Sequence, residues 1–125
     1  MINLVNFGRA LSDPTRVRIL NALRQSELCV CELVDALEVN GSTLSTHLQT
    51  LRNTGVVTTE KRRAWVIYSI SESAAPAIEA AFENFPTINS RIERDLDRLS
   101  RRMLLRVEGC CVAGARQLEQ EAMLV

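Results

Sequence analysis

The sequence lacks the features that mark several classes of protein. A single histidine among 125 residues excludes a metal site built from several histidines. No apolar run approaches the roughly 18 residues that a membrane-spanning helix needs. The first nine residues show no basic stretch followed by a long apolar segment. We therefore expect no signal peptide, no membrane partner and a cytoplasmic protein.

Residue sets for catalysis are scarce as well. The chain has no Cys-X-X-Cys redox motif and no Ser/His/Asp set, and one histidine offers little acid–base chemistry. We therefore do not expect an enzyme. A winged helix that binds only other proteins is an alternative, and salt-dependent binding to a palindromic promoter fragment would separate it from a DNA-binding protein.

The net charge is zero, because 15 Lys and Arg residues balance 15 Asp and Glu residues. Many DNA-binding domains are basic, so this balance argues mildly against DNA binding. The charges are unevenly distributed, however. Between Gly41 and Ser69 four basic residues face one acid, Glu60. A local basic patch on a neutral protein can still dock on phosphates.

The four cysteines form two pairs, Cys29 with Cys31 and Cys110 with Cys111. In a reducing cytosol we expect thiols rather than disulfides. The Cα atoms of adjacent cysteines lie about 3.8 Å apart, below the usual disulfide range that starts near 4.4 Å. Buried, inert cysteines are the plain alternative, but paired thiols favour metal or redox chemistry.

The apolar spacing predicts short helices followed by a hairpin. We expect a helix around residues 7–11, a second starting at Asp13 and Pro14, a third over residues 29–37, and a fourth capped by Ser42 and ended by Gly55. Two β-branched runs, 56–60 and 65–70, predict strands joined by residues 61–64.

The rest of the chain reads as helix, divided by Pro86. An apolar stripe follows on a helix of about 19 residues and should pack against a second copy of the chain. Its members are Ile88, Ile92, Leu96, Leu99 and Met103. The fold class we predict is mainly α with a β-hairpin: a winged helix-turn-helix with a helical dimer interface. Residues 1–106 form the DNA-binding and dimerisation domain, and residues 107–125 form a tail that carries a cysteine pair.

In a winged helix-turn-helix the second helix of the motif enters the major groove. The expected outer face of that helix is polar and almost free of acids, so it suits base edges and phosphates. The candidate DNA-binding residues are Ser42, Thr43, Ser45, Thr46, His47, Gln49 and Arg52 on the helix, with Lys61, Arg62 and Arg63 on the wing. We expect His47 to contact a phosphate or join a local network rather than bind a metal.

Four segments together resemble the ArsR/SmtB metal-sensing repressors. Residues 10–20 are similar to the opening of that family, 27–33 to its thiolate box, 45–55 to its recognition helix and 65–68 to its second wing strand. The resemblance implies a homodimer formed through the first and last helices. It also implies operator DNA as partner, and an inducer near the third helix that weakens DNA binding.

The resemblance assigns Cys29 and Cys31 as ligands of a soft ion. The family's third box cysteine is replaced by Val34, so we expect Cys110 or Cys111 to supply the missing sulfur. Arg63 stands where relatives often carry glycine, so the wing turn departs from the family's pattern at this position. Side chains two residues apart point about 200° apart on a helix, so both sulfurs converge only where the helix has unwound or not yet begun.

The predicted function is that of a repressor of an arsenic-resistance operon, released from DNA by arsenite or antimonite. Three thiolates suffice for arsenic(III). The alternatives are a repressor that responds to cadmium, lead or zinc through all four cysteines, and a repressor switched by thiol oxidation.

Overall fold

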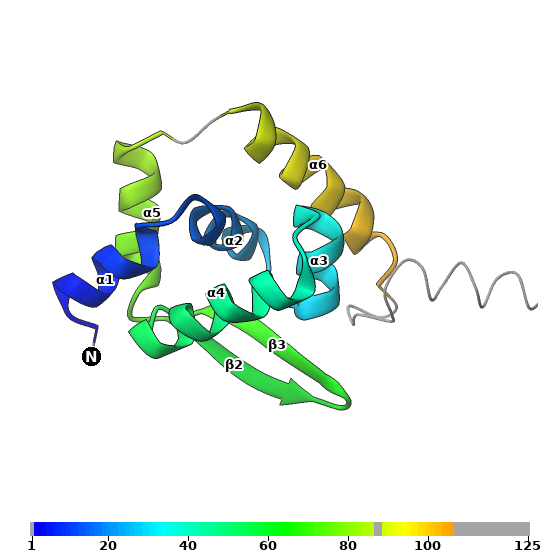
Figure 1. Ribbon diagram of the computed structural model, residues 1–125, viewed down its shortest axis with the longest axis horizontal. Coiled ribbons are helices and arrows are strands. Elements are labelled where there is room, and N and C mark those ends of the chain that lie inside the picture. Colours follow the sequence, from blue (N-terminus) through cyan, green and yellow to red (C-terminus); the bar gives the residue numbers. More distant parts are fainter. Residues whose placement is uncertain (1, 87–88, 107–125) are drawn as a thin grey trace, which may run out of the picture.

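The computed structural model describes residues 2–86 and 89–106. In chain order the elements are α1 (Leu4–Leu11), α2 (Pro14–Gln25), β1 (Leu28–Cys29), α3 (Val30–Leu37), α4 (Gly41–Thr54), β2 (Val57–Arg62), β3 (Trp65–Ile70), α5 (Ala75–Asn84) and α6 (Ser90–Met103). Helix α2 lies in the middle, with α1 and α5 on one side and α3 and α6 on the other (Figure 1). No helix in these two ranges is long and apolar enough to cross a membrane.

Local signals set several helix ends as expected. Asp13 caps α2, because its carboxylate accepts hydrogen bonds from the backbone N–H of Thr15 at 2.7 Å and of Arg16 at 3.2 Å. Gly55 ends α4 in the left-handed region at φ 84°, where a side chain is strained. Helix α4 begins earlier than expected: its cap is Asn40, not Ser42, because the Asn40 side chain accepts from the backbone N–H of Ser42 at 2.8 Å.

A three-stranded sheet has the order β1-β3-β2 and is antiparallel throughout. The expected hairpin is present, but β2 continues through Lys61 to Arg62, so only residues 63–64 connect the strands. Arg63 takes the left-handed conformation, at φ 57°, that a glycine would adopt more easily. The sequence did not predict β1, which pairs Cys29 with Ile67 of the wing.

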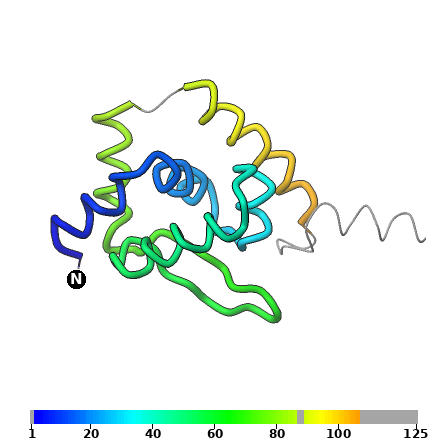
Figure 2. The backbone as a smooth tube through the Cα atoms, in the orientation of Figure 1, coloured from blue at the N-terminus to red at the C-terminus, as the bar shows by residue number. Residues whose placement is uncertain are grey.

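The core joins α2, α3 and α4 to the hairpin and to the later helices. Its largest fully buried side chains include Ile19, Leu20, Leu33, Leu37, Leu44, Leu48, Leu51, Ile78 and Leu99. The backbone trace in Figure 2 shows α4 and the hairpin at one end of this core and α6 running beside α3. The predicted fold, mainly α with a β-hairpin in the order of a winged helix-turn-helix, is confirmed.

One expectation about α6 is wrong. Ile92 and Leu99 of the expected dimerisation stripe are buried inside their own chain, and Met103 packs against the same core. The helix is also shorter than predicted, 14 residues starting at Ser90. Ile88 lies outside the described residues. The helix therefore covers α3 of the same chain with the face that we had assigned to a second copy.

Candidate thiol site and DNA-binding surface

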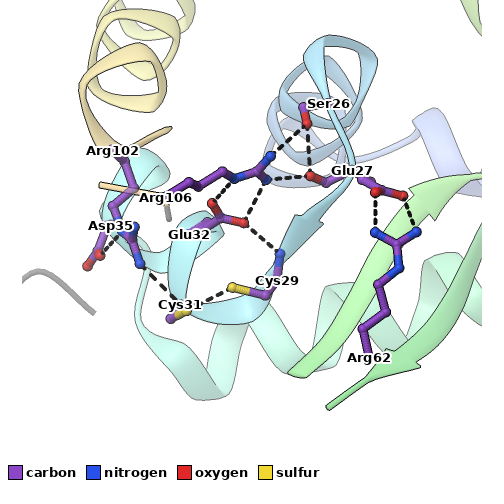
Figure 3. Close-up of polar contacts among 9 residues, drawn as sticks. All are labelled: Ser26, Glu27, Cys29, Cys31, Glu32, Asp35, Arg62, Arg102 and Arg106. Atoms are coloured by element: carbon purple, nitrogen blue, oxygen red, sulfur yellow. Dashed lines mark hydrogen bonds and ion pairs between the residues drawn. The ribbon is translucent and has the colours of Figure 1, made fainter. Parts of the chain in front are cut away.

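The sulfur atoms of Cys29 and Cys31 lie 2.8 Å apart (Figure 3). Cys29 is the last residue of β1 and the N-cap of α3, with extended backbone at φ −86° and ψ 169°. Cys31 is already in the first helical turn. Because the helix has not begun at Cys29, the two side chains turn to the same side and not apart. The condition for a shared ion is therefore met without unwinding α3.

Glu32 and Arg106 hold this strand-to-helix junction. The Glu32 carboxylate is fully buried and accepts from the backbone N–H of Cys29 at 3.1 Å. Arg106 donates to its two oxygens at 2.6 and 2.9 Å. Burial opposes the charge on Glu32, but the hydrogen bonds from Arg106 and Cys29 outweigh it and lower the pKa of the carboxyl. The junction beside the thiols is thus anchored to the end of the described chain.

Three arginines, two on α6 and one just beyond its end, contact α3. Arg98 donates to the carbonyl of Ala36 at 2.7 Å, and Arg102, one turn later, donates to Asp35 at 2.8 Å. Arg106 continues the series at Glu32. Arg102 also approaches the Cys31 sulfur at 3.7 Å, so a buried cation lies beside the thiol pair. The sequence analysis did not single out these arginines, although their spacing of four residues was a visible signal.

Two sulfurs do not complete a site for the ions considered. Among residues 2–86 and 89–106, no group of three or more His, Cys, Asp or Glu side chains could hold a metal ion. Cys110 and Cys111, expected to supply further sulfurs, lie outside the described residues. The thiol pair itself packs against Ile67 and Trp65 of the wing strand β3.

The outer face of α4 is exposed as predicted. Ser42, Thr43, Ser45, Thr46, Gln49 and Arg52 are exposed, whereas Leu44, Leu48 and Leu51 face the core. The Thr46 hydroxyl donates to the Ser42 carbonyl at 3.1 Å, and the Gln49 amide donates to Asn53 at 3.0 Å. Asn53 is a further exposed polar residue on this face that the sequence analysis did not single out.

His47 belongs to a network inside the protein. Its Nδ1 lies 3.3 Å from the Arg16 guanidinium, and its Nε2 lies 3.8 Å from Asp13. Because arginine only donates, Nδ1 accepts and the ring proton is on Nε2. Arg16 also donates to the Arg9 carbonyl at 3.1 and 2.8 Å. His47 thus ties the recognition helix to the ends of α1 and α2, which agrees with the local-network alternative.

The three wing cations, Lys61, Arg62 and Arg63, are all exposed, but Arg62 is engaged by two acids. Both Glu27 oxygens contact its guanidinium, one of them at 3.0 Å, and Glu60 accepts from it at 2.9 Å. The hydrogen bond from Arg62 lowers the pKa of Glu27. The bonds to Glu27 and then to Glu60 raise the pKa of Arg62.

Residues 13–59 match the family described as "Bacterial regulatory protein, arsR family". The arsenical resistance operon repressor of Staphylococcus xylosus is 33% identical over 82 residues, which cover 66% of this chain and 76% of that protein. The chain belongs to the arsR family. The family consists of DNA-binding transcriptional regulators, so α3 and α4 correspond to its helix-turn-helix and the β2–β3 hairpin to its wing.

Other proteins that resemble the chain do not share one ion in their names. The HTH-type transcriptional repressor SmtB of Mycobacterium tuberculosis is 45% identical over 64 residues, 51% of this chain and 47% of that protein. The NMR structure of the cadmium metal-sensor CMTR from the same species is 32% identical with a TM-score of 0.56, covering 69% of this chain and 86% of that one. The chain spans about half the length of the SmtB proteins that it matches.

Proposed function

We propose that the protein is a dimeric transcriptional repressor that binds operator DNA through α4 and the wing. It leaves the DNA when thiolates bind a thiophilic ion, and arsenite should act at a lower concentration than cadmium, lead or zinc. Residues 1–106 serve as the DNA-binding and dimerisation domain, and the tail from residue 107 supplies a ligand. The regulated genes are those of an arsenic-resistance operon, as the name of the Staphylococcus xylosus relative suggests.

The convergence of the Cys29 and Cys31 sulfurs carries this proposal. Thiolates are soft ligands that select soft ions, and the buried Arg102 guanidinium lies 3.7 Å from the Cys31 sulfur. Arsenic(III) forms three bonds, so one more sulfur completes its site. Arg106 is bound beside Cys29, and four residues span at most about 14 Å from its Cα to that of Cys110. The chain after Arg106 is therefore long enough for Cys110 or Cys111 of the same subunit to supply the third sulfur.

A cadmium-responsive repressor is the second candidate, supported by the likeness to the cadmium metal-sensor CMTR. Cadmium, lead or zinc would use all four thiolates in a tetrahedral site. The two candidates differ in their mutational pattern. An arsenite site tolerates the loss of one tail cysteine, whereas each of the four single Cys→Ser variants weakens a four-thiolate cadmium site.

The apolar surface for a second copy lies on α1 and α5 instead of α6. Leu4 and Val5 on α1 are 85% and 72% exposed, and Phe85 at the end of α5 is 75% exposed. A groove of about 380 Å³ lies between α1 and the start of α5, lined by side chains such as Leu4, Phe7 and Ala77. Exposed apolar patches of this kind mark protein–protein contacts. Sedimentation should show a dimer at micromolar concentration, and a monomer that still binds the operator would contradict this assignment.

A gel shift on the protein's own promoter tests the function. Arsenite, antimonite, cadmium, lead and zinc are compared in parallel at equal concentration. Arsenite and antimonite should release the DNA at the lowest concentrations. A chain that ends at Arg106 should still bind DNA but need far more arsenite for release. Unchanged release by that truncated chain would exclude the tail cysteines as ligands.

A further inference from the structure

Glu27 contacts both the wing and Arg106, the arginine that anchors the start of α3 beside the thiols (Figure 3). Its carboxylate holds the wing residue Arg62 with both oxygens. Its backbone carbonyl accepts from Arg106 at 2.8 Å, the same guanidinium that binds Glu32 at the start of α3. Only Leu28 separates Glu27 from Cys29. A change at the thiol pair therefore has a short, hydrogen-bonded route to a wing cation.

The sheet gives the thiol pair a second connection to the wing. Cys29 pairs with Ile67 and Leu28 with Tyr68, so β1 is an edge strand of the wing sheet itself. Cys29 and Cys31 share a small apolar cluster with Ile67 and Trp65, and Trp65 pairs in register with Arg62. An ion bound at the sulfurs would thus fix β1 against β3 close to Trp65, the β3 residue that pairs with Arg62.

We propose that Glu27 is a positioning residue that couples ion binding at Cys29 and Cys31 to the binding of the wing to DNA. Bound to Glu27, Arg62 is neutralised and turned toward β1, and is therefore withheld from DNA phosphates. On the operator, Arg62 exchanges the Glu27 carboxylate for a phosphate. An ion that joins Cys29 to Cys31 fixes β1 in the arrangement that retains Arg62, and so shifts the equilibrium toward the DNA-free form. This inference rests on the proposed function.

Glu60 and Glu79 provide matched controls. Glu60 also binds Arg62, at 2.9 Å, but it lies on β2 within the wing. Glu79 forms a two-bond ion pair with Arg24, at 2.9 Å for both bonds, between α5 and α2. Glu60→Gln therefore removes one of the two acids that hold Arg62 without touching the link to the thiols. Glu79→Gln removes one negative charge and one comparable ion pair elsewhere.

The experiment measures binding of the full-length protein to its own promoter duplex at several salt concentrations, with and without sodium arsenite. Without arsenite, Glu27→Gln should bind about two- to fivefold tighter than wild type, because Arg62 reaches its phosphate without first giving up an ion pair. Its salt slope should match that of wild type, because Arg62 contacts the same phosphate in both complexes. Glu60→Gln should tighten binding by a similar factor. Glu79→Gln should match wild type. In an Arg62→Ala background, Glu27→Gln should have no further effect.

Arsenite separates Glu27 from Glu60. It should weaken DNA binding by the same factor in wild type and in Glu60→Gln, and by a clearly smaller factor in Glu27→Gln. Arsenite binding itself is followed through Trp65, the single tryptophan, which packs on the thiol pair. Its fluorescence titration should be unchanged in Glu27→Gln, so a reduced release reflects lost coupling rather than lost ligand. Reciprocity also predicts that DNA weakens arsenite binding less in this variant than in wild type.

The outcomes distinguish the two proposals. If wild type releases DNA with arsenite and Glu27→Gln releases it by the same factor, the role of Glu27 is refuted while the repressor function stands. The role is likewise refuted if Glu79→Gln reproduces the effect, or if Glu27→Gln acts equally in the Arg62→Ala background. If wild type fails to bind the promoter or to respond to arsenite, the proposed function falls, and the coupling role falls with it.

Discussion

The ion pair between Arg18 and Asp95 should be the main electrostatic contact that holds α6 on the core. Asp95 accepts two hydrogen bonds from Arg18 and one from Arg98, all at 2.8 Å. The Arg18 and Asp95 side chains are only 10% and 3% exposed. Arg18 also donates to the Leu37 carbonyl at 2.6 Å, so the pair joins α2, α3 and α6. Asp95→Asn removes the charge while keeping the size of the side chain.

Removing one partner of a buried pair leaves the other charge buried and uncompensated, which costs about 3–5 kcal/mol. With a urea m-value of about 2 kcal/mol per molar, the unfolding midpoint should fall by about 1.5–2.5 M. Urea unfolding is followed by far-UV circular dichroism at one fixed protein concentration, because the stability of the proposed dimer would depend on concentration.

Asp97→Asn is the matched control on the same helix. Asp97 pairs with Arg101 at 2.8 Å, but both side chains are more than two-thirds exposed. Such a pair contributes about 0.3–0.5 kcal/mol, so the midpoint should move by only about 0.2 M. If Asp95→Asn shifted the midpoint no further than Asp97→Asn, the argument that this ion pair holds α6, and with it Arg102, over the thiols would be refuted.

Three further predictions concern acid stability, DNA and the thiols. Burial opposes the charge of Asp13, but the hydrogen bonds from the backbone N–H of Arg16 and Thr15 outweigh it and lower the pKa of Asp13. The ionised Asp13 therefore stabilises the fold above about pH 4, and this contribution is lost as the pH falls below that value. Stability measured from pH 5 to 3 should fall less steeply in Asp13→Asn, which keeps the cap but does not titrate in this range. Lys61→Ala should weaken binding to all DNA sequences alike and reduce the salt slope by about 0.9, and an unchanged slope in binding titrations would contradict its phosphate contact. Cys29→Ser should bind the operator like wild type and ignore arsenite in the same gel shift; release at wild-type concentrations would remove Cys29 from the ion site.

Much of the fold was predictable because its signals are local. Asp13 followed by Pro14 marks a helix start through one side chain and one ring, and Gly55 marks a helix end through its own backbone freedom. The misplaced start of α4 has the same origin: Asn40 and Ser42 are both good caps, and sequence alone does not choose between them. Strand β1 has two residues, too few to show alternation, and exists because β3 offers it a partner.

The surroundings of the thiol pair depend on contacts between distant parts of the chain. Arg102 and Arg106 reach Asp35 and Glu32 across 67 and 74 residues, so no local pattern reveals the pairing. The apolar stripe of α6 was visible, but its periodicity does not tell whether it packs on its own chain or on a second copy. The cysteine pair was found because Cys-X-Cys is a chemical signal, yet the convergence of its sulfurs depended on α3 beginning after Cys29.

The last prediction concerns His47, which the sequence placed among the residues that touch DNA. Its ring accepts from Arg16 and is half-buried, so we expect it to position α4 rather than to contact phosphate. His47→Ala loses about one hydrogen bond, roughly 1 kcal/mol, which should weaken operator binding about three- to tenfold. His47→Gln retains an acceptor for Arg16 and should recover much of that loss.

The salt dependence of binding decides between the two roles of His47. A positioning residue releases no counterion, so the salt slope of His47→Ala should equal that of wild type, whereas the slope of Lys61→Ala falls. Anisotropy titrations on the promoter duplex at several salt concentrations give both slopes. A flatter slope in His47→Ala, not restored by His47→Gln, would mean that the imidazole turns from Arg16 to a phosphate on DNA, and the positioning role would be wrong.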